Sequence, residues 1–194
     1  ETRTVRDSAA LLDCVHGPMP GDPYTINHPA RPYIEEIGKD PGKLKIGFVK
    51  EIPGVDVKAP CALAVETVAK ELTSLGHRVE ENWPKAMNMN EADELLASHI
   101  INVIASYQAY SIAQYSQTIG REIGPDDMDC DNWTVTELGR NLTATQYLAA
   151  VDAVNKFCRD MASWWDNGFD LLITPTIPEP PPPIGELVPD KNEP

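Results

Sequence analysis

The chain has 194 residues, of which 42% are hydrophobic and 24% charged, so it can bury a core and is not expected to be disordered. Its 30 acidic side chains outnumber its 16 Lys and Arg, and the formal net charge of −14 disfavours anionic partners. We therefore expect an acidic globular protein that binds neither nucleic acid nor a membrane surface.

The cysteines indicate the cellular compartment. They are widely spaced and form no C-x-x-C pair, which favours free thiols in a reducing cytoplasm over a disulfide framework. No apolar run approaches the roughly 20 residues of a membrane-spanning helix, and no signal peptide is visible. We expect a cytoplasmic protein with free thiols at Cys14, Cys61, Cys130 and Cys158.

The first predicted element is a helix that begins after Thr4. The hydroxyl of Thr4 and the carboxylate of Asp7 have the spacing of a capping box, in which side chains bond the free N–H groups of the first turn. Apolar residues then recur at helical spacing from Val5 to Val15, and Gly17 ends the helix.

Two segments are rich in helix-breaking and strand-breaking residues. Residues 17–43 contain six prolines and four glycines, which predicts an ordered connection along the surface instead of a continuous element. Residues 177–194 form a proline-rich tail, and its proline tract can only run as polyproline II because it lacks backbone donors.

Residues 44–80 are typical of a strand–helix–strand unit. Apolar residues alternate over 44–49 as in a strand, Pro60 suits the first turn of a helix, and Gly76 suits its end. A second strand is expected at 77–80, parallel to the first, because a connection of this length implies a crossover. The helix is expected to bury one face, made of Cys61, Val68, Leu72 and Leu75.

The carboxyl-terminal half is predicted to be mainly helical. A helix is expected over 90–120, followed by an acidic loop at 124–129 and a second helix that begins with a capping box between Thr143 and Gln146. A short apolar strand at 171–173, buried on both faces, completes an α/β fold. The second helix is expected to face the sheet with Tyr147, Val151, Val154, Cys158, Met161 and Trp165.

The sequence offers no complete catalytic constellation. It has no Gly-x-Ser-x-Gly and no Ser-x-x-Lys, and no serine stands beside a glycine or another serine, so we assign no catalytic residue. The acidic residues near 126–131 lack the central glycine and closing glutamate of a calcium loop. No metal site is expected, because the histidines are scattered at His16, His28, His77 and His99.

One short motif is a candidate binding element. Thr174, Pro175 and Thr176 follow a predicted buried strand, and the carboxyl ends of strands are where ligands collect in open α/β sheets. The alternative is that the motif only terminates the strand. The residues alone favour neither interpretation.

One motif at the start of the chain is Thr2-Arg3-Thr4-Val5-Arg6-Asp7, and one near its end is Phe169-Asp170-Leu171-Leu172-Ile173-Thr174-Pro175-Thr176, followed by Pro180-Pro181-Pro182-Pro183-Ile184-Gly185. Between them stand Lys43-Leu44-Lys45-Ile46-Gly47 and Leu75-Gly76-His77-Arg78-Val79-Glu80. The two end motifs together resemble the amidase signature family, whose members hydrolyse carboxamides. The last of these motifs consists of an aspartate, an apolar run, Thr-Pro-Thr and a proline-rich Ile-Gly, and the middle of the chain conforms as well. Gly17-Pro18 with Pro20-Gly21-Asp22-Pro23 looks most like the bacterial branch that includes nylon-oligomer (aminohexanoate cyclic dimer) hydrolase.

This resemblance implies that residues 1–194 are the C-terminal part of a single amidase domain with a mixed, mostly parallel central sheet covered by helices. The family's catalytic lysine and two serines would lie upstream, in a missing N-terminal part of the same domain. The implied reaction is acyl transfer to serine followed by hydrolysis of a small-molecule amide, without metal or cofactor. Thr174, Pro175 and Thr176 would then form a wall of the substrate pocket.

Two other interpretations stay open. The chain is also compatible with a non-catalytic α/β binding or interaction module, and with the amidase subunit of a tRNA-dependent amidotransferase. A reading frame that continues upstream into a Gly/Ser-rich stretch would favour an amidase, and a start codon near Glu1 the module. If the chain is part of an amidase, the strands at 44–49 and 171–176 are expected to adjoin further strands outside it.

Overall fold

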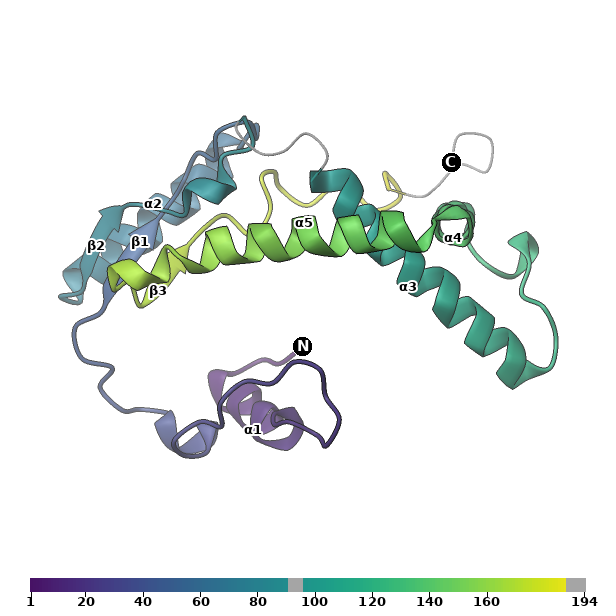
Figure 1. Ribbon diagram of the computed structural model, residues 1–194. Coiled ribbons are helices and arrows are strands. Elements are labelled where there is room, and N and C mark those ends of the chain that lie inside the picture. Colours follow the sequence, from purple (N-terminus) through teal and green to yellow (C-terminus); the bar gives the residue numbers. More distant parts are fainter. Residues whose placement is uncertain (91–95, 188–194) are drawn as a thin grey trace. The chain divides into compact units, whose positions relative to one another are not determined.

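The computed structural model describes residues 1–90 and 96–187, and the chain divides into two compact units, Glu1–Gly42 and Lys43–Pro194. The first unit contains helix α1 (Val5–Val15) (Figure 1). As predicted, the Thr4 hydroxyl accepts a hydrogen bond from the Asp7 N–H at 3.0 Å. Within 17–43 the chain forms one short 3-10 helix, η1 (Tyr33–Glu36), whose first two N–H groups donate to the Asp13 carboxylate at 2.7 and 2.9 Å.

In the second unit, the described residues form a three-stranded parallel sheet. Its strands are β1 (Lys45–Phe48), β2 (Arg78–Glu81) and β3 (Leu171–Ile173), in the order β2-β1-β3. The α/β fold with parallel strands is therefore confirmed. The central strand has a neighbour on each side within the chain, so the expectation of a neighbour from outside is wrong for β1. β3 has one edge that no described strand covers.

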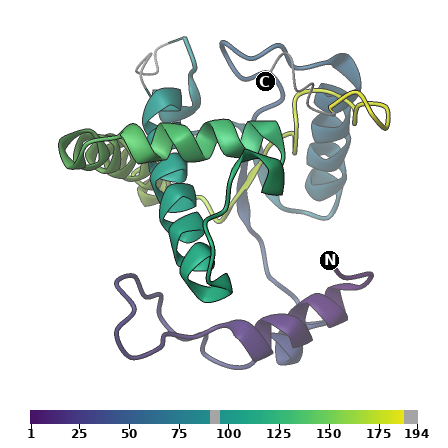
Figure 2. The same cartoon turned by 90° about the vertical axis from the view of Figure 1, so that its right-hand side faces the viewer.

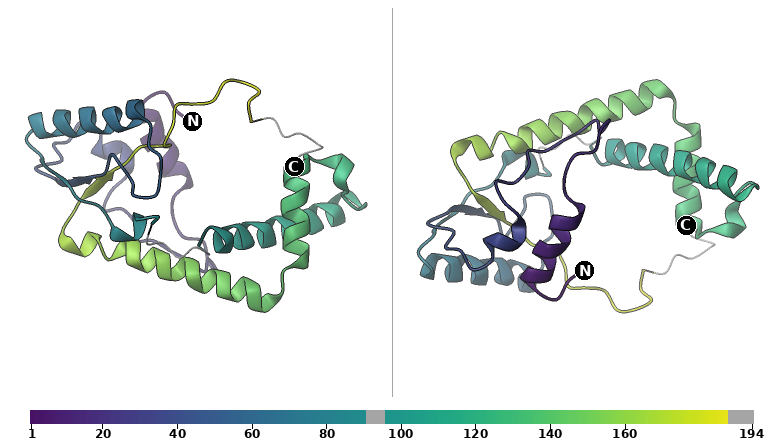
Figure 3. Two further views of the ribbon diagram at one scale, coloured as in Figure 1. Left: turned by 90° about the horizontal axis from the view of Figure 1, so that it is seen from above. Right: turned by 90° about the horizontal axis from the view of Figure 1, so that it is seen from below.

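The two faces of the sheet are covered by different helices (Figure 3). Consecutive residues of a strand face opposite sides of the sheet, so Gly47 faces one side and Phe48 the other. Helix α2 (Ala59–Ser74) lies on the side of Phe48, and the residues that follow helix α5 (Ala144–Ala162) lie on the side of Gly47, where Trp164 packs.

The buried face of α2 differs from the expected one. Val65 and Ala69 are buried, whereas Val68 and Leu75 are 42% and 73% exposed. Apolar residues occur around much of this helix, so the periodicity alone fits more than one face. The small side chain of Ala69 allows close approach to the sheet, which a count of large apolar residues does not detect.

Helix α3 (Leu96–Ile119) packs against both α4 (Cys130–Asn141) and α5 (Figure 2). At the crossing of α3 and α4, a Cβ on Gly139 would lie 2.0 Å from the Ala105 carbonyl oxygen, so only glycine permits this approach. The predicted acidic loop at 124–129 is confirmed in part, because the segment connects α3 to α4 but residues 125–127 within it form the short 3-10 helix η3 (Pro125–Asp127).

The predicted start of α5 is confirmed and its predicted face is confirmed in part. Thr143 and Gln146 form the capping box, with the Gln146 N–H donating to the Thr143 hydroxyl at 3.3 Å. Ala150 is fully buried, but Cys158 is exposed. The buried side continues to Trp164, one residue before the Trp165 that the pattern indicated, because the chain turns at the end of the helix and begins the 3-10 helix η4 (Trp165–Asn167).

Parts of two predictions fall outside the described residues, namely 91–95 of the predicted helix 90–120 and 188–194 of the proline-rich tail 177–194. Residues 177–187 contain neither helix nor strand. In residues 1–90 and 96–187, no helix combines the length and the apolar character that crossing a bilayer would require.

Candidate functional site

The strand order reverses at the boundary between β1 and β3. From β1 the chain passes through α2 on one face to β2, whereas β3 lies on the other side of β1 and is reached from α5 on the opposite face. In open parallel sheets, such a reversal leaves a crevice at the carboxyl ends of the two diverging strands, and ligands bind there. The topology therefore points to the residues that follow β1 and β3.

Thr174, Pro175 and Thr176 occupy this position. The Val49 N–H donates to the Ile173 carbonyl at 3.0 Å, which extends the pairing of β1 and β3 up to the motif. Thr174 and Pro175 are half-buried and Thr176 is exposed.

The two threonine hydroxyls have different surroundings. The Thr174 hydroxyl donates to the Pro175 carbonyl at 3.2 Å. Within residues 1–90 and 96–187, no hydrogen bond involves the hydroxyl of Thr176. Of the two hydroxyls, Thr176 is therefore the one available to a ligand.

An ion pair that the sequence did not indicate lies at the same edge of the sheet. The Lys50 ammonium, two residues beyond β1, donates to the Glu66 carboxylate of α2 at 2.6 Å. This hydrogen bond raises the pKa of Lys50 and lowers the pKa of Glu66, so both groups are charged at neutral pH. Because their side chains are about one-third exposed, the pair serves chiefly to orient the loop after β1. The sequence placed Lys50 after a predicted strand, which put it at this edge of the sheet, but nothing in the sequence identified Glu66 as its partner.

Two hollows lie on the faces of the sheet. The hollow beneath α2 has a volume of about 450 Å³ and includes Lys50 and Glu66 in its lining. The larger hollow, of about 850 Å³, lies on the α5 side and is lined by Trp83, Phe157 and Trp164 among others. Neither includes Thr174, Pro175 or Thr176 in its lining, so the candidate site is the open edge at the ends of β1 and β3.

The larger hollow is bordered by a rigid aromatic cluster. The Trp164 indole N–H donates to the Asn82 side chain at 2.8 Å, and its ring stacks on Phe169 with centroids 4.2 Å apart. The Lys45 ammonium lies 3.9 Å above the Phe169 ring and donates to the Asn167 carbonyl at 2.8 Å. These contacts fix the approach of the chain to β3, and with it the position of the candidate site.

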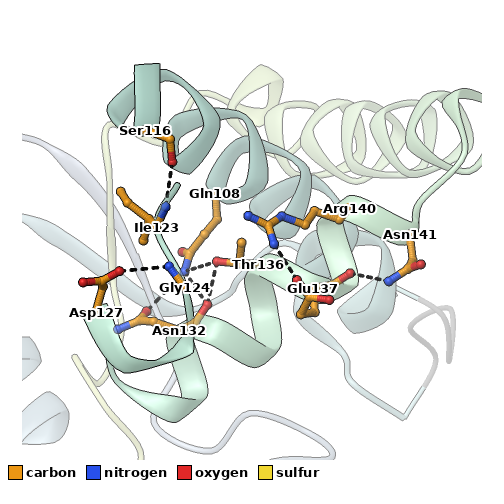
Figure 4. A network of polar contacts seen from close by, with 10 residues as sticks. All are labelled: Gln108, Ser116, Ile123, Gly124, Asp127, Asn132, Thr136, Glu137, Arg140 and Asn141. Carbon is orange, nitrogen blue, oxygen red and sulfur yellow. Dashed lines mark hydrogen bonds and ion pairs between the residues drawn. The ribbon is translucent and has the colours of Figure 1, made fainter. Parts of the chain in front are cut away.

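Several acidic and amide side chains of α3, α4 and the segment between them are engaged in polar contacts with one another (Figure 4). The Gln108 amide donates to the Asn132 carbonyl at 2.8 Å and to the fully buried Thr136 hydroxyl at 3.3 Å. Arg121 pairs with Asp127 through two hydrogen bonds of 2.7 and 2.8 Å. This pairing, with the Gly124 N–H, holds the pKa of Asp127 well below its usual range. Asp127 thus has a structural role.

The histidines lie in different surroundings. The His77 ring accepts a hydrogen bond from the Leu44 N–H at 3.2 Å, and the His16 ring packs edge-on against Tyr33 at 5.3 Å between centroids. Among the residues that the structure describes, no three His, Cys, Asp or Glu side chains converge as a metal site would require.

Comparison with known proteins identifies similar chains. The family model described as Amidase matches residues 1–194. The 6-aminohexanoate-cyclic-dimer hydrolase of Pseudomonas sp. (strain NK87) is 33% identical over 188 residues, covering 96% of this chain and 37% of the hydrolase. A solved structure of 6-aminohexanoate cyclic dimer hydrolase superposes with a TM-score of 0.89 at 32% identity, covering 98% of this chain and 39% of its own.

A more distant relative is a glutamyl-tRNA(Gln) amidotransferase subunit of Akkermansia muciniphila. It is 26% identical over 205 residues, which cover 95% of this chain and 42% of the relative. The chain thus spans about two-fifths of the length of each of these relatives.

Proposed function

The chain belongs to the amidase family, and we propose that it is the C-terminal part of an enzyme that hydrolyses the C–N bond of small carboxamides. Its 33% identity to 6-aminohexanoate-cyclic-dimer hydrolase assigns it to the nylon-oligomer hydrolase-like branch of the family. The observation that carries the proposal is the position of Thr174, Pro175 and Thr176 at the carboxyl edge where the strand order reverses. There the motif forms one wall of a substrate pocket.

In this proposal the chain contributes binding and a missing N-terminal part contributes the chemistry. A serine upstream would be acylated by the amide, releasing the amine, and water would then hydrolyse the acyl-enzyme. The described residues contribute the wall, and the exposed Thr176 hydroxyl can bond a polar group of the substrate. No residue of this chain is assigned a catalytic role.

Exposed apolar surface supports the view that these residues belong to a larger domain. Ile101, Ile104 and Tyr107 on α3 are 48%, 54% and 62% exposed, and one edge of β3 has no partner among the described strands. Unpaired edges and clustered apolar side chains are usually covered by further protein. The relatives have more than twice the length of this chain, which leaves enough protein to cover them.

The same proposal treats 17–43 as a connection, 177–194 as a proline-rich tail and residues 1–194 as one part of a single domain. A cytoplasmic location rests on the four cysteines, none of which forms a disulfide within the part of the chain that the structure describes. The amidotransferase subunit is the weaker alternative, because this chain is 26% identical to it and 33% identical to the cyclic-dimer hydrolase.

The proposal is tested by Thr176→Val in the full-length protein that contains this chain. The substitution keeps the shape of the side chain and removes one hydroxyl, whose hydrogen bond contributes about 0.5–1.5 kcal/mol. We expect KM for at least one carboxamide to rise roughly 2- to 10-fold while turnover persists.

Thr174→Val is the matched control, since the Thr174 hydroxyl already donates to the Pro175 carbonyl. It should affect the melting temperature more than KM. If the full-length protein hydrolyses no carboxamide, the proposed activity is wrong. If Thr176→Val lowers the melting temperature without changing the kinetics on several amides, the motif is only structural.

A further inference from the structure

The Thr174–Thr176 motif is held at both of its ends by backbone hydrogen bonds from the β1–α2 region. Before the motif, the Ile173 carbonyl accepts from the Val49 N–H at 3.0 Å. After it, the Pro178 carbonyl accepts from the Lys58 N–H at 2.7 Å. The first bond continues the β1–β3 ladder, whereas the second lies outside the sheet. The motif is thus a short span fixed at two points.

The donor of the second bond is itself rigidly placed. Lys58 is the N-cap of α2, and its own carbonyl accepts from the Cys61 and Ala62 N–H groups at 2.9 and 3.2 Å. Its N–H lies outside the helical hydrogen-bond pattern and is therefore available to a partner. On the acceptor side, the rings of Pro175 and Pro178 restrict the backbone at two positions of the span. Few conformations of the span remain once the Lys58–Pro178 bond has formed.

We propose that Lys58 is a positioning residue for substrate specificity, acting through its backbone N–H on Pro178 to set the place of the Thr176 hydroxyl. This inference rests on the proposed function, because it assumes that Thr176 contacts an amide substrate. The Lys58 ammonium donates to Asp56 at 2.5 Å and is also attracted by Glu179, the residue after Pro178, so the side chain adds an electrostatic contact beside the backbone bond. The start of α2 and the pocket wall are thereby coupled, although they are far apart in the sequence.

The backbone of Lys58 itself allows its donor to be removed by substitution with proline. Lys58 has φ −67° and ψ 144°, which are dihedral angles of proline, and proline has no N–H. The Cδ of the proline ring would take the place of the amide hydrogen and push the Pro178 carbonyl away, which displaces the span. In the full-length protein, Lys58→Pro should raise KM for the amides that are sensitive to Thr176→Val by about 3- to 10-fold, with kcat within twofold. Lys58→Arg keeps the N–H and the positive charge near Asp56 and Glu179, so it is the matched control and should leave KM unchanged.

A second pair of variants tests the acceptor side and covers the case in which Lys58→Pro does not fold. Pro178→Gly keeps the carbonyl but frees its backbone, and should also raise KM selectively. Pro182→Gly changes an exposed proline of the tail and should have no effect. A rise in KM with both Lys58→Pro and Pro178→Gly, and with neither control, supports the inference.

Other outcomes overturn it. If Thr176→Val changes KM while Lys58→Pro and Pro178→Gly only lower the melting temperature, the Lys58 bond is structural and the inference fails while the proposed function stands. If no carboxamide is hydrolysed, both fail together.

Discussion

Gly47 is the position at which a single methyl group should most clearly disturb the fold. It lies in the central strand, opposite Trp164, and a Cβ there would lie 2.4 Å from the Asn82 carbonyl oxygen and 2.5 Å from the Trp164 ring. Real Cβ contacts below 3.0 Å are essentially absent from proteins. Gly47→Ala should therefore force Trp164 away from the strand, because the backbone of Asn82 cannot move freely.

The magnitude follows from the contacts that would be lost. Overpacking of this kind costs about 1–3 kcal/mol. Displacing Trp164 also weakens its hydrogen bond to Asn82 and its stacking on Phe169, each of about 0.5–1.5 kcal/mol. Against this, alanine in a strand gains about 0.5–1 kcal/mol over glycine, since Gly47 does not have a positive φ. We expect a net loss of about 2–4 kcal/mol in the free energy of unfolding.

Urea unfolding followed by circular dichroism and tryptophan fluorescence measures this loss. Gly124→Ala is the matched control, because a Cβ there meets nothing within 4 Å and its φ of −114° is ordinary. In a Trp164→Ala background, Gly47→Ala should cost less, since one of its two clashes is gone. A Gly47→Ala protein as stable as the wild type within about 0.5 kcal/mol would refute the reasoning.

Two further substitutions test α5 and the α3–α4 contact. Val154→Asp should lower the free energy of unfolding by about 1–3 kcal/mol, because it places a charge at a half-buried position of α5. Asp152→Asn, on the exposed side of the same helix, should change the free energy of unfolding little. Equal effects of the two substitutions would mean that the buried face of α5 has been assigned wrongly. Asp127→Asn should lower the melting temperature near pH 7, and the difference from the wild type should shrink as the pH falls below about 4. The reason is that the pKa of Asp127 is lower in the folded protein than in the unfolded chain. Its carboxylate therefore stabilises the fold at a pH above the unfolded-state pKa, and this stabilisation is lost as the pH falls towards the folded-state pKa. Asp126→Asn, which is exposed, is the control for that comparison, and a difference that does not depend on pH would exclude the Arg121–Asp127 pair as its cause.

The features predicted correctly from the sequence are those that depend on residues close together in the chain. The caps at Thr4 and Thr143 are confirmed, since a side chain and the N–H three residues later are enough to specify them. The parallel pairing of β1 and β2 is confirmed as well, because a helix between two strands leaves little choice. Helix α4 was missed, since its polar sequence lacks a clear apolar stripe and its packing depends on Gly139 meeting Ala105 across two helices.

The candidate site could be predicted only in part. The strand before Thr174 made the motif visible, because an apolar run followed by a proline is a local pattern. The contacts of its flanking residues with Val49 and Lys58 could not be predicted, since they join segments more than 100 positions apart through backbone atoms that carry no residue signature. The pairing of β3 beside β1 likewise depends on tertiary packing.

The pairing of β3 with β1 also has a consequence for the order in which this protein assembles. β1, α2 and β2 are contiguous, so their contacts close short loops and can form early, whereas the Lys45 N–H and the Asp170 carboxylate, which bond at 2.8 Å, are 125 positions apart. Contacts of such long range slow folding, because chain entropy is lost before they form. During synthesis β3 leaves the ribosome after α3, α4 and α5, and must reach an edge of β1 that has stayed open until then. The span between Ile173 and Pro178 is therefore among the last parts of the chain to take its place.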